Sequence, residues 1–507
     1  MSMSVIGELL RHRARLSPDV EALVSPTKRF TYREYNRIVN KLAHYLLQLQ
    51  VQKGDRIALI CKNSHAFAII YMAAAKIGAL TVPINWRLKT DGIRYILEDC
   101  TPKILFYDKE FNEVAPLLGT LPFIQQEIRL DIDDASFLEK LVEGYPEEEP
   151  QVDVIGEDPA VIIYTSGTTG RSKGVVCTHN NMYSASIANT TTLDWRYRDR
   201  FLVTSPLFHI SGMIIPICCL VRGLTMVVND QFHPMKIWEL LDAEKINTMF
   251  SVPSMLNFMY ESLKYNFVDV PSLRMIICGG AKVPAELIRG MYDFGYQVVQ
   301  VYGATEFAGA ATFWLPEYGI ETCESAGKAV YQTEMKIVHP ATGEALPPGE
   351  IGEVVLRGPL MFAGYWKMEE ATQEVIRHGW YHTRDVGWMD ENGLLYVIDR
   401  LRDMIITSGE NVFPAQVESV INQLEQVAES AVVGVAHPVW GELARAYVVL
   451  KEGNSITEEE IITYVRRYLP DHSLHEVVFV DQLPKNSMGK VMKYVLRQHA
   501  NQQKKAQ

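Results

Sequence analysis

A long uninterrupted apolar run is missing from this sequence. The longest apolar stretch, GMIIPICCLV, ends before Arg222 and is well short of the roughly 20 residues that a membrane-spanning helix needs. The N-terminal stretch MSMSVIGELLRHRARLSPD lacks the apolar segment of a signal peptide and is typical of an amphipathic helix. We therefore expect no integral membrane segment and a cytoplasmic protein.

Paired cysteines and positive charge are scarce as well. The cysteines number 7, an odd count, and they form no CxxC pair and no cluster with histidine. This excludes the common zinc-site spacings and favours reduced thiols in the core of a cytosolic protein. The 49 Lys and Arg residues stand against 61 Asp and Glu residues, which gives a net charge of -12. Such a balance argues against nucleic acid or an anionic membrane as the main partner.

The rest of the composition is that of a soluble globular protein. Apolar residues make up 48% and charged residues 22% of the 507 positions, and this length favours more than one domain. The stretch from Phe30 to Leu49 begins with a capping box, Thr31 to Glu34, and continues with one apolar face, which predicts a helix. Residues 54–61 predict a strand and residues 66–79 another helix. This βα rhythm predicts mostly parallel sheets covered by helices.

The pattern changes near Glu350, where short strand patterns alternate with Gly/Pro turns. From Met404 onward, strand and helix patterns form a compact run, and one of its helices opens with a second capping box, Thr457 to Glu460. We predict an α/β protein, with a large N-terminal domain of βα-rich subdomains plus a β-rich subdomain and a small α+β C-terminal domain. The predicted parts are residues 1–399, a connection at 400–402, and residues 403–507.

One loop has the composition of a phosphate cradle. The stretch YTSGTTGRSKG, Tyr164 to Gly174, follows an apolar run at residues 160–163. Its glycines allow close approach of the backbone to a ligand, its hydroxyls donate hydrogen bonds, and Lys173 adds a positive charge. The spacing does not match the G-x-x-x-x-G-K-[ST] phosphate loop. A solvent-exposed turn between two strands is the alternative interpretation.

Further stretches combine turn residues with chemically active side chains. They are ICGGAKVP at Ile277–Pro284, VYGATE at Val301–Glu306, WYHTRDVG with Asp385, DRLRDMI with Arg400, and PKNSMGK ending in Lys490. Each one alone also fits a purely structural role. Together, in this order, they resemble the adenylate-forming superfamily of acyl-CoA synthetases, luciferases and peptide-synthetase adenylation domains. The resemblance extends from about Leu9 to Lys493, and its motifs YTSGTTGxxKG, YGxTE, GEN-x-x-P and PKNxxGK are highly specific.

The resemblance implies an ATP-dependent carboxylic acid–CoA ligase that acts in two steps. A carboxylate attacks the α-phosphate of ATP to give an acyl-adenylate and pyrophosphate, and the thiol of CoA then displaces AMP. The first step brings an anion against a polyanion, so it needs cations and donors aimed at the developing charge. The implied cofactors and co-substrates are ATP, Mg²⁺ and CoA, and the implied partners are small molecules, with no nucleic acid. A homodimer is left open.

The resemblance also implies roles for individual residues. ATP binding is implied for Thr165, Ser166, Gly167, Thr168, Thr169, Gly170, Lys173, Gly280, Ala281, Tyr302, Gly303, Asp385 and Arg400. In this set the loop at Tyr164–Gly174 would hold the phosphates, Tyr302 would stack on adenine, and Asp385 would accept hydrogen bonds from the ribose hydroxyls. The implied catalytic residues are Lys490, Thr305, Glu306 and His209, with Glu306 also holding Mg²⁺. Lys490 would bridge the substrate carboxylate and the α-phosphate.

A mobile C-terminal domain is a further implication of the resemblance. It would pivot at Arg402, where the family usually has Asp or Lys, and Ser408, Gly409 and Glu410 would face the CoA channel. Arg384 stands where the family usually has Gly, before the ribose aspartate. A Tyr-Lys pair often seen before a late strand is missing from LPDHSLHEVVF. None of these departures removes a group that the chemistry demands, so we expect an active enzyme.

The acid itself is predicted from the residues expected around its chain. An amino acid is disfavoured, because His209 stands where amino-acid-activating relatives place the aspartate that pairs with the ammonium. The expected acyl pocket contains Met213, Met255, Phe307, Ala308 and Gly309. These residues favour a medium-chain fatty, alicyclic or aromatic acid. The alternatives are an enzyme that loads a carrier protein in place of CoA and a catalytically silent nucleotide-binding relative.

Overall fold

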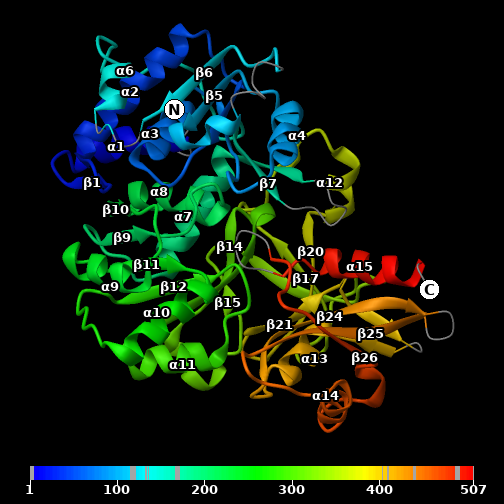
Figure 1. The fold of residues 1–507 in the computed structure, drawn as a ribbon. Coiled ribbons are helices and arrows are strands. Elements are labelled where there is room, and N and C mark those ends of the chain that lie inside the picture. The colour runs from blue at the N-terminus through cyan, green and yellow to red at the C-terminus, as the bar shows by residue number, and fades with distance from the viewer. Residues whose placement is uncertain are drawn as a thin grey trace. The chain divides into compact units, whose positions relative to one another are not determined.

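The computed structural model describes residues 5–505 apart from 115–120, 132–133, 135, 166–171, 402, 408–409, 438–440 and 486–490. The chain forms two compact units (Figure 1). The first unit comprises Met1–Met335 and Leu356–Tyr381, and the second comprises Lys336–Val355 and His382–Gln507. The chain passes between the units within strands β16 (Glu334–Val338), β17 (Gly352–Arg357) and β20 (Trp380–Met389).

The first unit contains two large sheets that are mostly parallel, as the βα rhythm predicts. One sheet has nine strands in the order β15-β14-β13-β12-β11-β9-β10-β1-β2. Its strands are β1 (Glu21–Val24), β2 (Arg29–Thr31), β9 (Arg200–Val203), β10 (Thr225–Val228), β11 (Thr248–Ser251), β12 (Met275–Gly279), β13 (Val298–Ala304), β14 (Gly309–Trp314) and β15 (Lys328–Ala329). Strands β1, β10, β9, β11, β12 and β13 are parallel to one another, and β2, β14 and β15 pair antiparallel.

The other large sheet has seven strands in the order β18-β8-β7-β4-β3-β5-β6. Its strands are β3 (Arg56–Ile60), β4 (Leu80–Pro83), β5 (Ile104–Asp108), β6 (Gln126–Leu130), β7 (Pro159–Thr165), β8 (Lys173–Thr178) and β18 (Gly364–Tyr365). Strands β7 and β8 form an antiparallel hairpin, and β18 adds to β8 as an edge strand. A segment from near the end of the first unit therefore lies beside β8, the strand that follows the predicted phosphate loop in the sequence.

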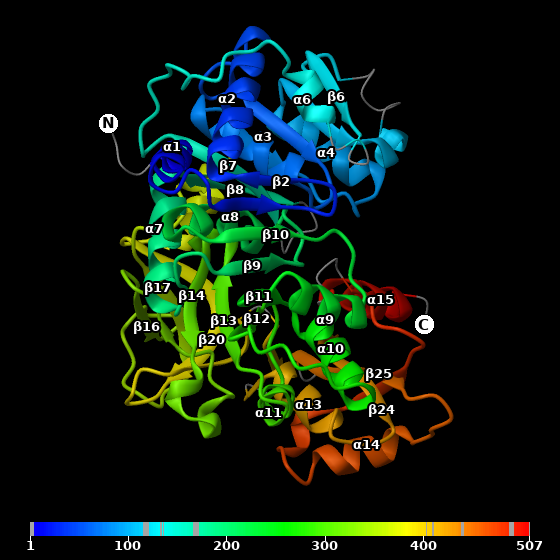
Figure 2. The same ribbon diagram turned by 90° about the vertical axis from the view of Figure 1, so that its left-hand side faces the viewer.

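Helices cover these sheets, as Figure 2 shows for α9, α10 and α11 beside β11 and β12. The helices are α1 (Ile6–Leu16), α2 (Tyr32–Gln48), α3 (His65–Lys76), α4 (Thr90–Cys100), α6 (Phe137–Leu141), α7 (His179–Thr192), α8 (Ile210–Arg222), α9 (Pro234–Ala243), α10 (Pro253–Tyr265), α11 (Ala285–Asp293) and α12 (Glu369–Val375). Short 3₁₀ turns are η1 (Lys109–Val114), η2 (Thr305–Phe307), η3 (Pro316–Tyr318) and η4 (Ile320–Thr322). Thr31 caps α2 through the predicted capping box with Glu34.

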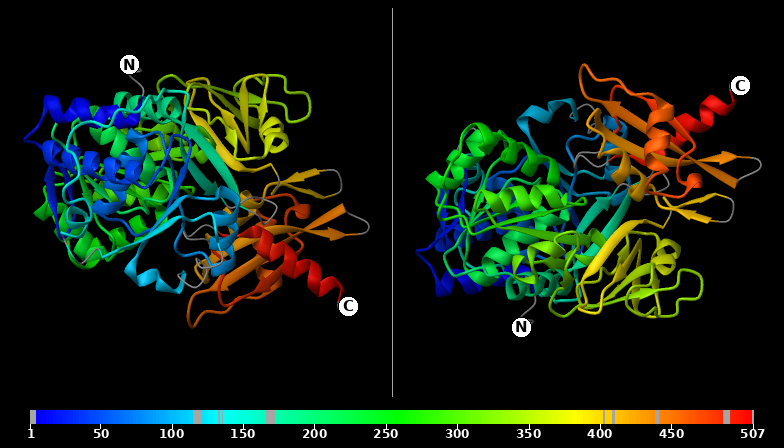
Figure 3. Two further views of the ribbon diagram at one scale, coloured as in Figure 1. Left: turned by 90° about the horizontal axis from the view of Figure 1, so that it is seen from above. Right: turned by 90° about the horizontal axis from the view of Figure 1, so that it is seen from below.

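The second unit carries the β-rich segment and the C-terminal run. A five-stranded sheet has the order β16-β17-β20-β19, with β21 (Leu395–Arg400) beside β20. Its strand β19 (Ile376–Arg377) falls within the residues of the first unit. Another five-stranded sheet contains β22 (Ile405–Thr407), β23 (Glu410–Val412), β24 (Val427–His437), β25 (Gly441–Leu450) and β26 (Glu476–Phe479). The helices are α13 (Pro414–Ile421), α14 (Glu458–Val465) and α15 (Lys493–Lys505), with the 3₁₀ turn η5 (Asp471–Ser473). Helix α15 packs against β24 (Figure 3), and the predicted capping box from Thr457 to Glu460 opens α14.

The prediction for the N-terminal stretch is confirmed. The N-terminal stretch forms α1, an amphipathic helix whose Arg13 donates to the carbonyls of Leu220 and Val221 at the end of α8 (2.8 and 2.7 Å). In the described part of the chain, no helix is both long enough and apolar enough to cross a bilayer.

The seven cysteines are free and buried. The predicted domain boundary at 400–402 stays a prediction, and Arg402 lies outside the described residues.

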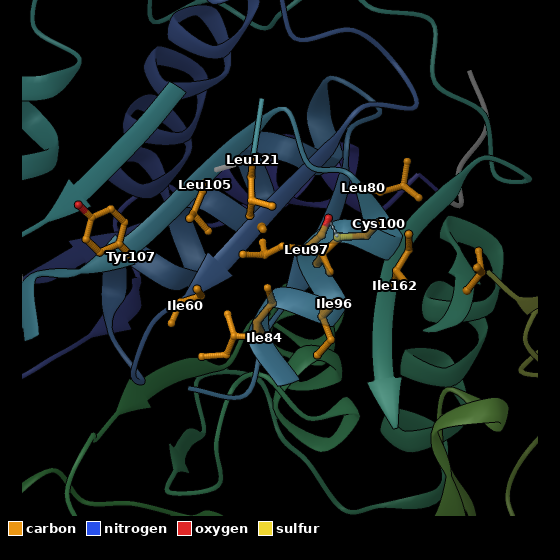
Figure 4. Close-up of a cluster of buried hydrophobic side chains, with 14 residues drawn as sticks. Ile60, Leu80, Ile84, Ile96, Leu97, Cys100, Leu105, Tyr107, Leu121 and Ile162 are labelled. Atoms are coloured by element: carbon orange, nitrogen blue, oxygen red, sulfur yellow. Dashed lines mark hydrogen bonds between the residues drawn. The ribbon is translucent and has the colours of Figure 1, made fainter. Parts of the chain in front are cut away.

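One hydrophobic core cluster lies against the seven-stranded sheet (Figure 4). Buried side chains of β3, β4, β5 and β7 meet the apolar face of α4 there, including Ile96 and Leu97. The partly buried Tyr164 and Trp366 pack against this cluster. The core therefore supports the end of β7, where the predicted phosphate loop begins, and the residue directly after the edge strand β18.

We predict that Leu97→Ala destabilises the first unit by about 2–5 kcal/mol, because Leu97 is completely buried and its loss leaves a cavity. Urea unfolding followed by circular dichroism measures this change. Leu97→Met keeps the volume and should cost less than about 1.5 kcal/mol. Equal stability of the alanine variant and the parent would contradict the packing described.

Candidate functional site

The carboxyl ends of four parallel strands bring several predicted residues to one edge of the nine-stranded sheet. Gly280 follows β12, Tyr302 and Gly303 lie at the end of β13, and His209 and Met255 follow β9 and β11. These strands are neighbours in the order β13-β12-β11-β9. Ligands of open α/β sheets bind beyond this edge. The predicted adenine residues and His209 therefore share one edge, with Ala281 directly after Gly280.

The turn after β13 places Thr305 and Glu306 in a 3₁₀ turn, η2, before the chain returns as β14. Gly303 is required here, because a Cβ at this position would lie 1.8 Å from the carbonyl oxygen of Gly309. Ala308 adopts φ 50° and its amide donates to the carbonyl of Thr305 (3.1 Å). The tight turn holds Glu306 half-buried at the sheet edge.

His209 stands at the N-terminal cap of α8. Its ring lies 4.5 Å from that of Phe208, which in turn meets the indole of Trp86 edge-on at 6.5 Å. The Nε2 atom is buried and has no hydrogen-bond partner in the described structure. Burial, with a smaller contribution from the positive charge of Arg87, lowers the pKa of His209 from 6.5 to about 4. The imidazole is therefore neutral at pH 7.

The predicted acyl-pocket residues come from α8, α10, η2 and β14. Met213, Phe307 and Ala308 are fully buried, whereas Met255 is half-buried. A Cβ on Gly309 would lie 3.8 Å from Ile210, the residue after His209, and α8 contacts β14. The structure thus brings His209, Met213 and the start of β14 together. Met213, Ile210 and Gly309 give this region apolar neighbours, and their role as an acyl pocket stays a prediction.

The predicted phosphate loop connects the antiparallel strands β7 and β8. Thr165 pairs with Lys173 and Tyr164 with Gly174 in this hairpin. A Cβ on Gly174 would lie 2.8 Å from Ile162 and 3.2 Å from the Cβ of Trp366, so the strand needs glycine there. Ser166, Gly167, Thr168, Thr169 and Gly170 lie outside the described residues.

Tyr365, which the sequence analysis did not single out, connects the base of this hairpin to Glu306. Its hydroxyl donates to Glu306 Oε1 (2.8 Å), and its ring centroid lies 4.9 Å from the Nζ of Lys173. The backbone around Tyr365 is also bound to the turn after β13 and to the hairpin. The amide of Phe362 donates to the carbonyl of Glu306 (2.9 Å), and β18 pairs with β8. No spacing of residues along the chain indicates this contact, since Glu306 and Tyr365 meet only in the folded chain.

Glu306 suits a divalent cation that also binds phosphate. Within the described residues no lysine or arginine forms an ion pair with its half-buried carboxylate, whose one described side-chain hydrogen bond comes from Tyr365. No group of three or more His, Cys, Asp or Glu side chains in that part of the chain forms a metal cluster. Mg²⁺ commonly uses one or two carboxylates, with waters and substrate phosphates as its other ligands. A single uncompensated carboxylate fits this mode of binding.

In the second unit, Asp385 and Arg400, two residues of the predicted ATP site, form an ion pair. They lie opposite each other on β20 and β21, and Arg400 Nε is 2.6 Å from Asp385 Oδ1. Asp385 is only 4% exposed, and its amide donates to Thr383 Oγ1 (3.0 Å). The charge of the buried carboxylate is thereby balanced and its orientation is fixed.

Arg384 adopts φ 59°, in the left-handed region that favours glycine. The departure noted in the sequence therefore falls at a position whose backbone conformation suits the usual Gly. Buried Glu353 supports the turn: its Oε1 accepts from the amide of Arg384 (3.1 Å) and its Oε2 lies 2.8 Å from His382 Nδ1. Glu353 had no sequence signal, because it lies on the neighbouring strand β17.

Several predicted residues fall outside the described chain. Lys490, Arg402, Ser408 and Gly409 are among them. Lys485 and Val491, which flank the segment with Lys490 in the sequence, form an isolated antiparallel β-bridge. Val491 lies two residues before the start of α15. Glu410 begins β23, and its backbone pairs with Thr407. The roles of these residues stay predictions.

We predict that Arg384→Gly stabilises the second unit by up to about 1 kcal/mol. The left-handed conformation costs an ordinary residue about 1–2 kcal/mol, and part of this gain is lost because glycine is more flexible in the unfolded chain. Thermal unfolding of Arg384→Gly and Arg384→Ala separates the backbone effect from the loss of the side chain. The alanine variant should show no gain, and a glycine variant that is less stable than the alanine variant would contradict the strained backbone.

The buried His209 predicts a dependence of stability on pH. In the unfolded chain histidine takes up a proton as the pH falls through 6.5, whereas folded His209 does so only near pH 4. The unfolding free energy should therefore decrease as the pH is lowered from 6.5 to about 4, by at most about 1.4 kcal/mol per pH unit for this group. His209→Gln should reduce the slope of the stability curve in this window. His233→Gln, at an exposed position, is the control, and equal slopes for both variants would exclude a buried neutral His209.

Known proteins are similar to this chain in both sequence and fold. The sequence profile of the AMP-binding enzyme family matches residues 10–366, and the profile of the AMP-binding enzyme C-terminal domain matches residues 416–490. The long-chain-fatty-acid–CoA ligase FadD13 of Mycobacterium tuberculosis is 38% identical over 504 residues, covering 98% of each chain. The feruloyl-CoA synthase of an Amycolatopsis species is 34% identical, covering 97% of this chain and 98% of the relative.

Solved structures of a third enzyme match the fold closely. The o-succinylbenzoate CoA synthetase MenE of Bacillus subtilis, in complex with its acyl-adenylate intermediate, gives a TM-score of 0.87 at 30% identity, covering 96% and 97% of the two chains. The same enzyme in complex with ATP and magnesium ion gives a TM-score of 0.86 at 29% identity, covering 97% and 99%. This chain therefore belongs to the AMP-binding enzyme family, in the acyl-CoA synthetase branch of the adenylate-forming superfamily.

Proposed function

We propose that this protein is an AMP-forming acid–thiol ligase that joins an apolar carboxylic acid to CoA with ATP. The observation that carries this proposal is the arrangement of Lys173 and Glu306 around Tyr365 at the base of the predicted phosphate loop. Here one cation and one carboxylate stand close to a common residue, and neither forms an ion pair with a described side chain. A polyanion and its divalent cation complement such a pair.

The reaction proceeds through an acyl-adenylate. A carboxylate oxygen of the acid forms a bond to the α-phosphorus of ATP while pyrophosphate leaves with the electrons of the broken P–O bond. The thiolate of CoA then attacks the acyl carbon, and AMP leaves with the electrons of the C–O bond. Both leaving groups are stabilised anions, so the residues of the chain act by binding, orientation and charge.

The first unit holds the triphosphate and the base in this proposal. Thr165, Ser166, Thr168, Thr169 and Lys173, with the glycine amides of the loop, bind phosphate oxygens, and Thr305 donates to the α-phosphate. Bound Mg²⁺ on Glu306 would supply positive charge to the phosphates. Adenine stacks on Tyr302, beside Gly280, Ala281 and Gly303. Support for this arrangement comes from the shared carboxyl edge of β12 and β13.

The second unit supplies the ribose contact and the catalytic lysine. Asp385 accepts from the ribose hydroxyls and keeps its orientation through Arg400. Lys490 bridges the carboxylate and the α-phosphate. The domain pivots at Arg402 between the two steps, and Ser408, Gly409 and Glu410 then line the CoA channel. These assignments extend the resemblance, and the pairing of buried Asp385 with Arg400 is their support in the described structure.

The acid in this proposal is a medium-chain fatty, alicyclic or aromatic acid. Buried Met213 and Phe307, with the small residues Ala308 and Gly309, give an apolar lining between α8 and β14. Neutral His209 stands beside these residues and leaves the substrate carboxylate to the charged groups of the ATP site. The names of FadD13 and of the feruloyl-CoA synthase refer to a fatty and an aromatic acyl group, which supports this range.

Location and assembly remain predictions. A cytoplasmic location is supported by seven cysteines that are all free and buried. A homodimer would be compatible with the reaction, which needs one chain only. Transfer to a carrier protein is the alternative to CoA, and a silent nucleotide-binding protein is the alternative to an enzyme.

A product screen by mass spectrometry tests the proposal. Purified protein, ATP and Mg²⁺ meet straight-chain, alicyclic and aromatic acids with and without CoA. We expect acyl-CoA and AMP for a subset of apolar acids. Acyl-adenylate without thioester would favour the carrier protein, and failure of every acid to give product would favour the silent relative.

The matched variant for this screen is Lys490→Gln, which removes the charge at the residue assigned to the first step. Its rate of acyl-adenylate formation should fall on the order of 10²–10³-fold, while the affinity for ATP stays close to that of the parent. An adenylation rate equal to that of the parent would remove Lys490 from the proposed mechanism and leave the ligase activity standing.

A further inference from the structure

Tyr365 touches both charged groups on which the proposed ATP site depends. Its hydroxyl donates to Glu306 Oε1 (2.8 Å), and the Nζ of Lys173 lies 4.9 Å from its ring centroid. One side chain therefore presents its polar tip to the carboxylate and its π face to the ammonium. Both contacts lie within the first unit.

The position of this tyrosine is fixed from several sides. Its amide donates to Thr372 Oγ1 (2.8 Å), and the next amide, of Trp366, donates to the carbonyl of Gly174 (2.7 Å). The ring of Phe362 meets it edge-on at 5.0 Å. The backbone on one side of Tyr365 is thus bound to the residue after Lys173, and the amide of Phe362 is bound to Glu306 itself.

A lysine and a glutamate this close to a common residue attract each other. A direct ion pair between Lys173 and Glu306 would neutralise both groups and would use the charge that phosphate oxygens and a divalent cation need. In the described structure this pair does not form, and no other described side chain forms an ion pair with either group. A hydrogen bond to an ionised carboxylate favours its charged form, and an aromatic face attracts a cation without neutralising it.

We propose that Tyr365 is a positioning residue that keeps Lys173 and Glu306 apart and ready to bind. Its hydroxyl orients Glu306 and leaves the second carboxylate oxygen to the cation, and its ring holds Lys173 away from that carboxylate. This inference rests on the proposed function of Glu306 and Lys173. It adds the residue that stops the two charges from neutralising each other before ATP arrives.

Two substitutions separate the two contacts. Tyr365→Phe keeps the ring and removes the hydroxyl, whereas Tyr365→Leu removes both. With a non-hydrolysable ATP analogue bound, Mn²⁺ affinity is measured by electron paramagnetic resonance, and ATP affinity without metal is measured by calorimetry. For Tyr365→Phe we expect weaker Mn²⁺ binding, by about five- to tenfold, and an unchanged affinity for metal-free ATP.

For Tyr365→Leu we expect metal-free ATP to bind more weakly as well, by about three- to tenfold, because Lys173 can then pair with Glu306. The double variant Tyr365→Leu/Glu306→Gln removes that competing carboxylate. Its affinity for metal-free ATP should return toward the parent value, although a second residue has been lost. Simple damage to the fold would leave the double variant as weak as the single one or weaker.

The control is Tyr318→Leu, which removes another tyrosine whose ring carries a lysine, Lys328, also at 4.9 Å. It should bind Mn²⁺ and ATP as the parent does. Thermal unfolding confirms that each variant is folded, and if Tyr365→Leu fails to fold, the Mn²⁺ affinity of Tyr365→Phe decides. Parent-like Mn²⁺ binding by Tyr365→Phe, or no recovery in the folded double variant, would overturn the inference. Parent-like Mn²⁺ binding by Glu306→Gln alone would instead overturn the proposed role of Glu306.

Discussion

A protein of net charge -12 can hold a polyanion only where a few cations are kept free of carboxylates. In the first unit this condition is met at Lys173, which stands over an aromatic ring without a described ion pair. Elsewhere in the described structure many lysines and arginines form ion pairs with acids, such as Lys76 with Glu149. Among the cations without such a pair, Lys173 is set apart by its place at the base of the β7–β8 hairpin, against a tyrosine that also binds Glu306.

The fold satisfies this condition by bringing distant segments together. The hairpin, the turn after β13 and the edge strand β18 are separated along the chain, yet they meet through the hydrogen bonds of Phe362 and Trp366. Gly174 makes the approach of β18 possible, because a Cβ there would lie 2.8 Å from Ile162 and 3.2 Å from the Cβ of Trp366. Gly303 lets the turn after β13 close, because a Cβ there would lie 1.8 Å from the carbonyl oxygen of Gly309. The glycines of these motifs thus serve close packing between strands, in addition to any contact with a ligand.

Much of this arrangement can be predicted from the sequence because it is local. The capping boxes at Thr31 and Thr457 and the alternation of helix and strand depend on short-range patterns and are confirmed. Tyr365 and Glu353 could not be predicted in this way. Their partners lie on other strands, and only the register of the folded sheets brings a hydroxyl to Glu306 or a carboxylate to the turn at Arg384.

The two units balance charge by opposite means, and this difference fits what each group would bind in the proposed mechanism. Asp385 is almost fully buried and is neutralised by Arg400, which suits a residue that accepts hydrogen bonds from uncharged hydroxyls. Glu306 is half-buried, and among the described side chains a phenol alone donates to its carboxylate, which suits a residue that meets a cation. If Glu306 had a fixed arginine partner, that partner would compete with the metal, whereas a neutral donor fixes its orientation and keeps its charge.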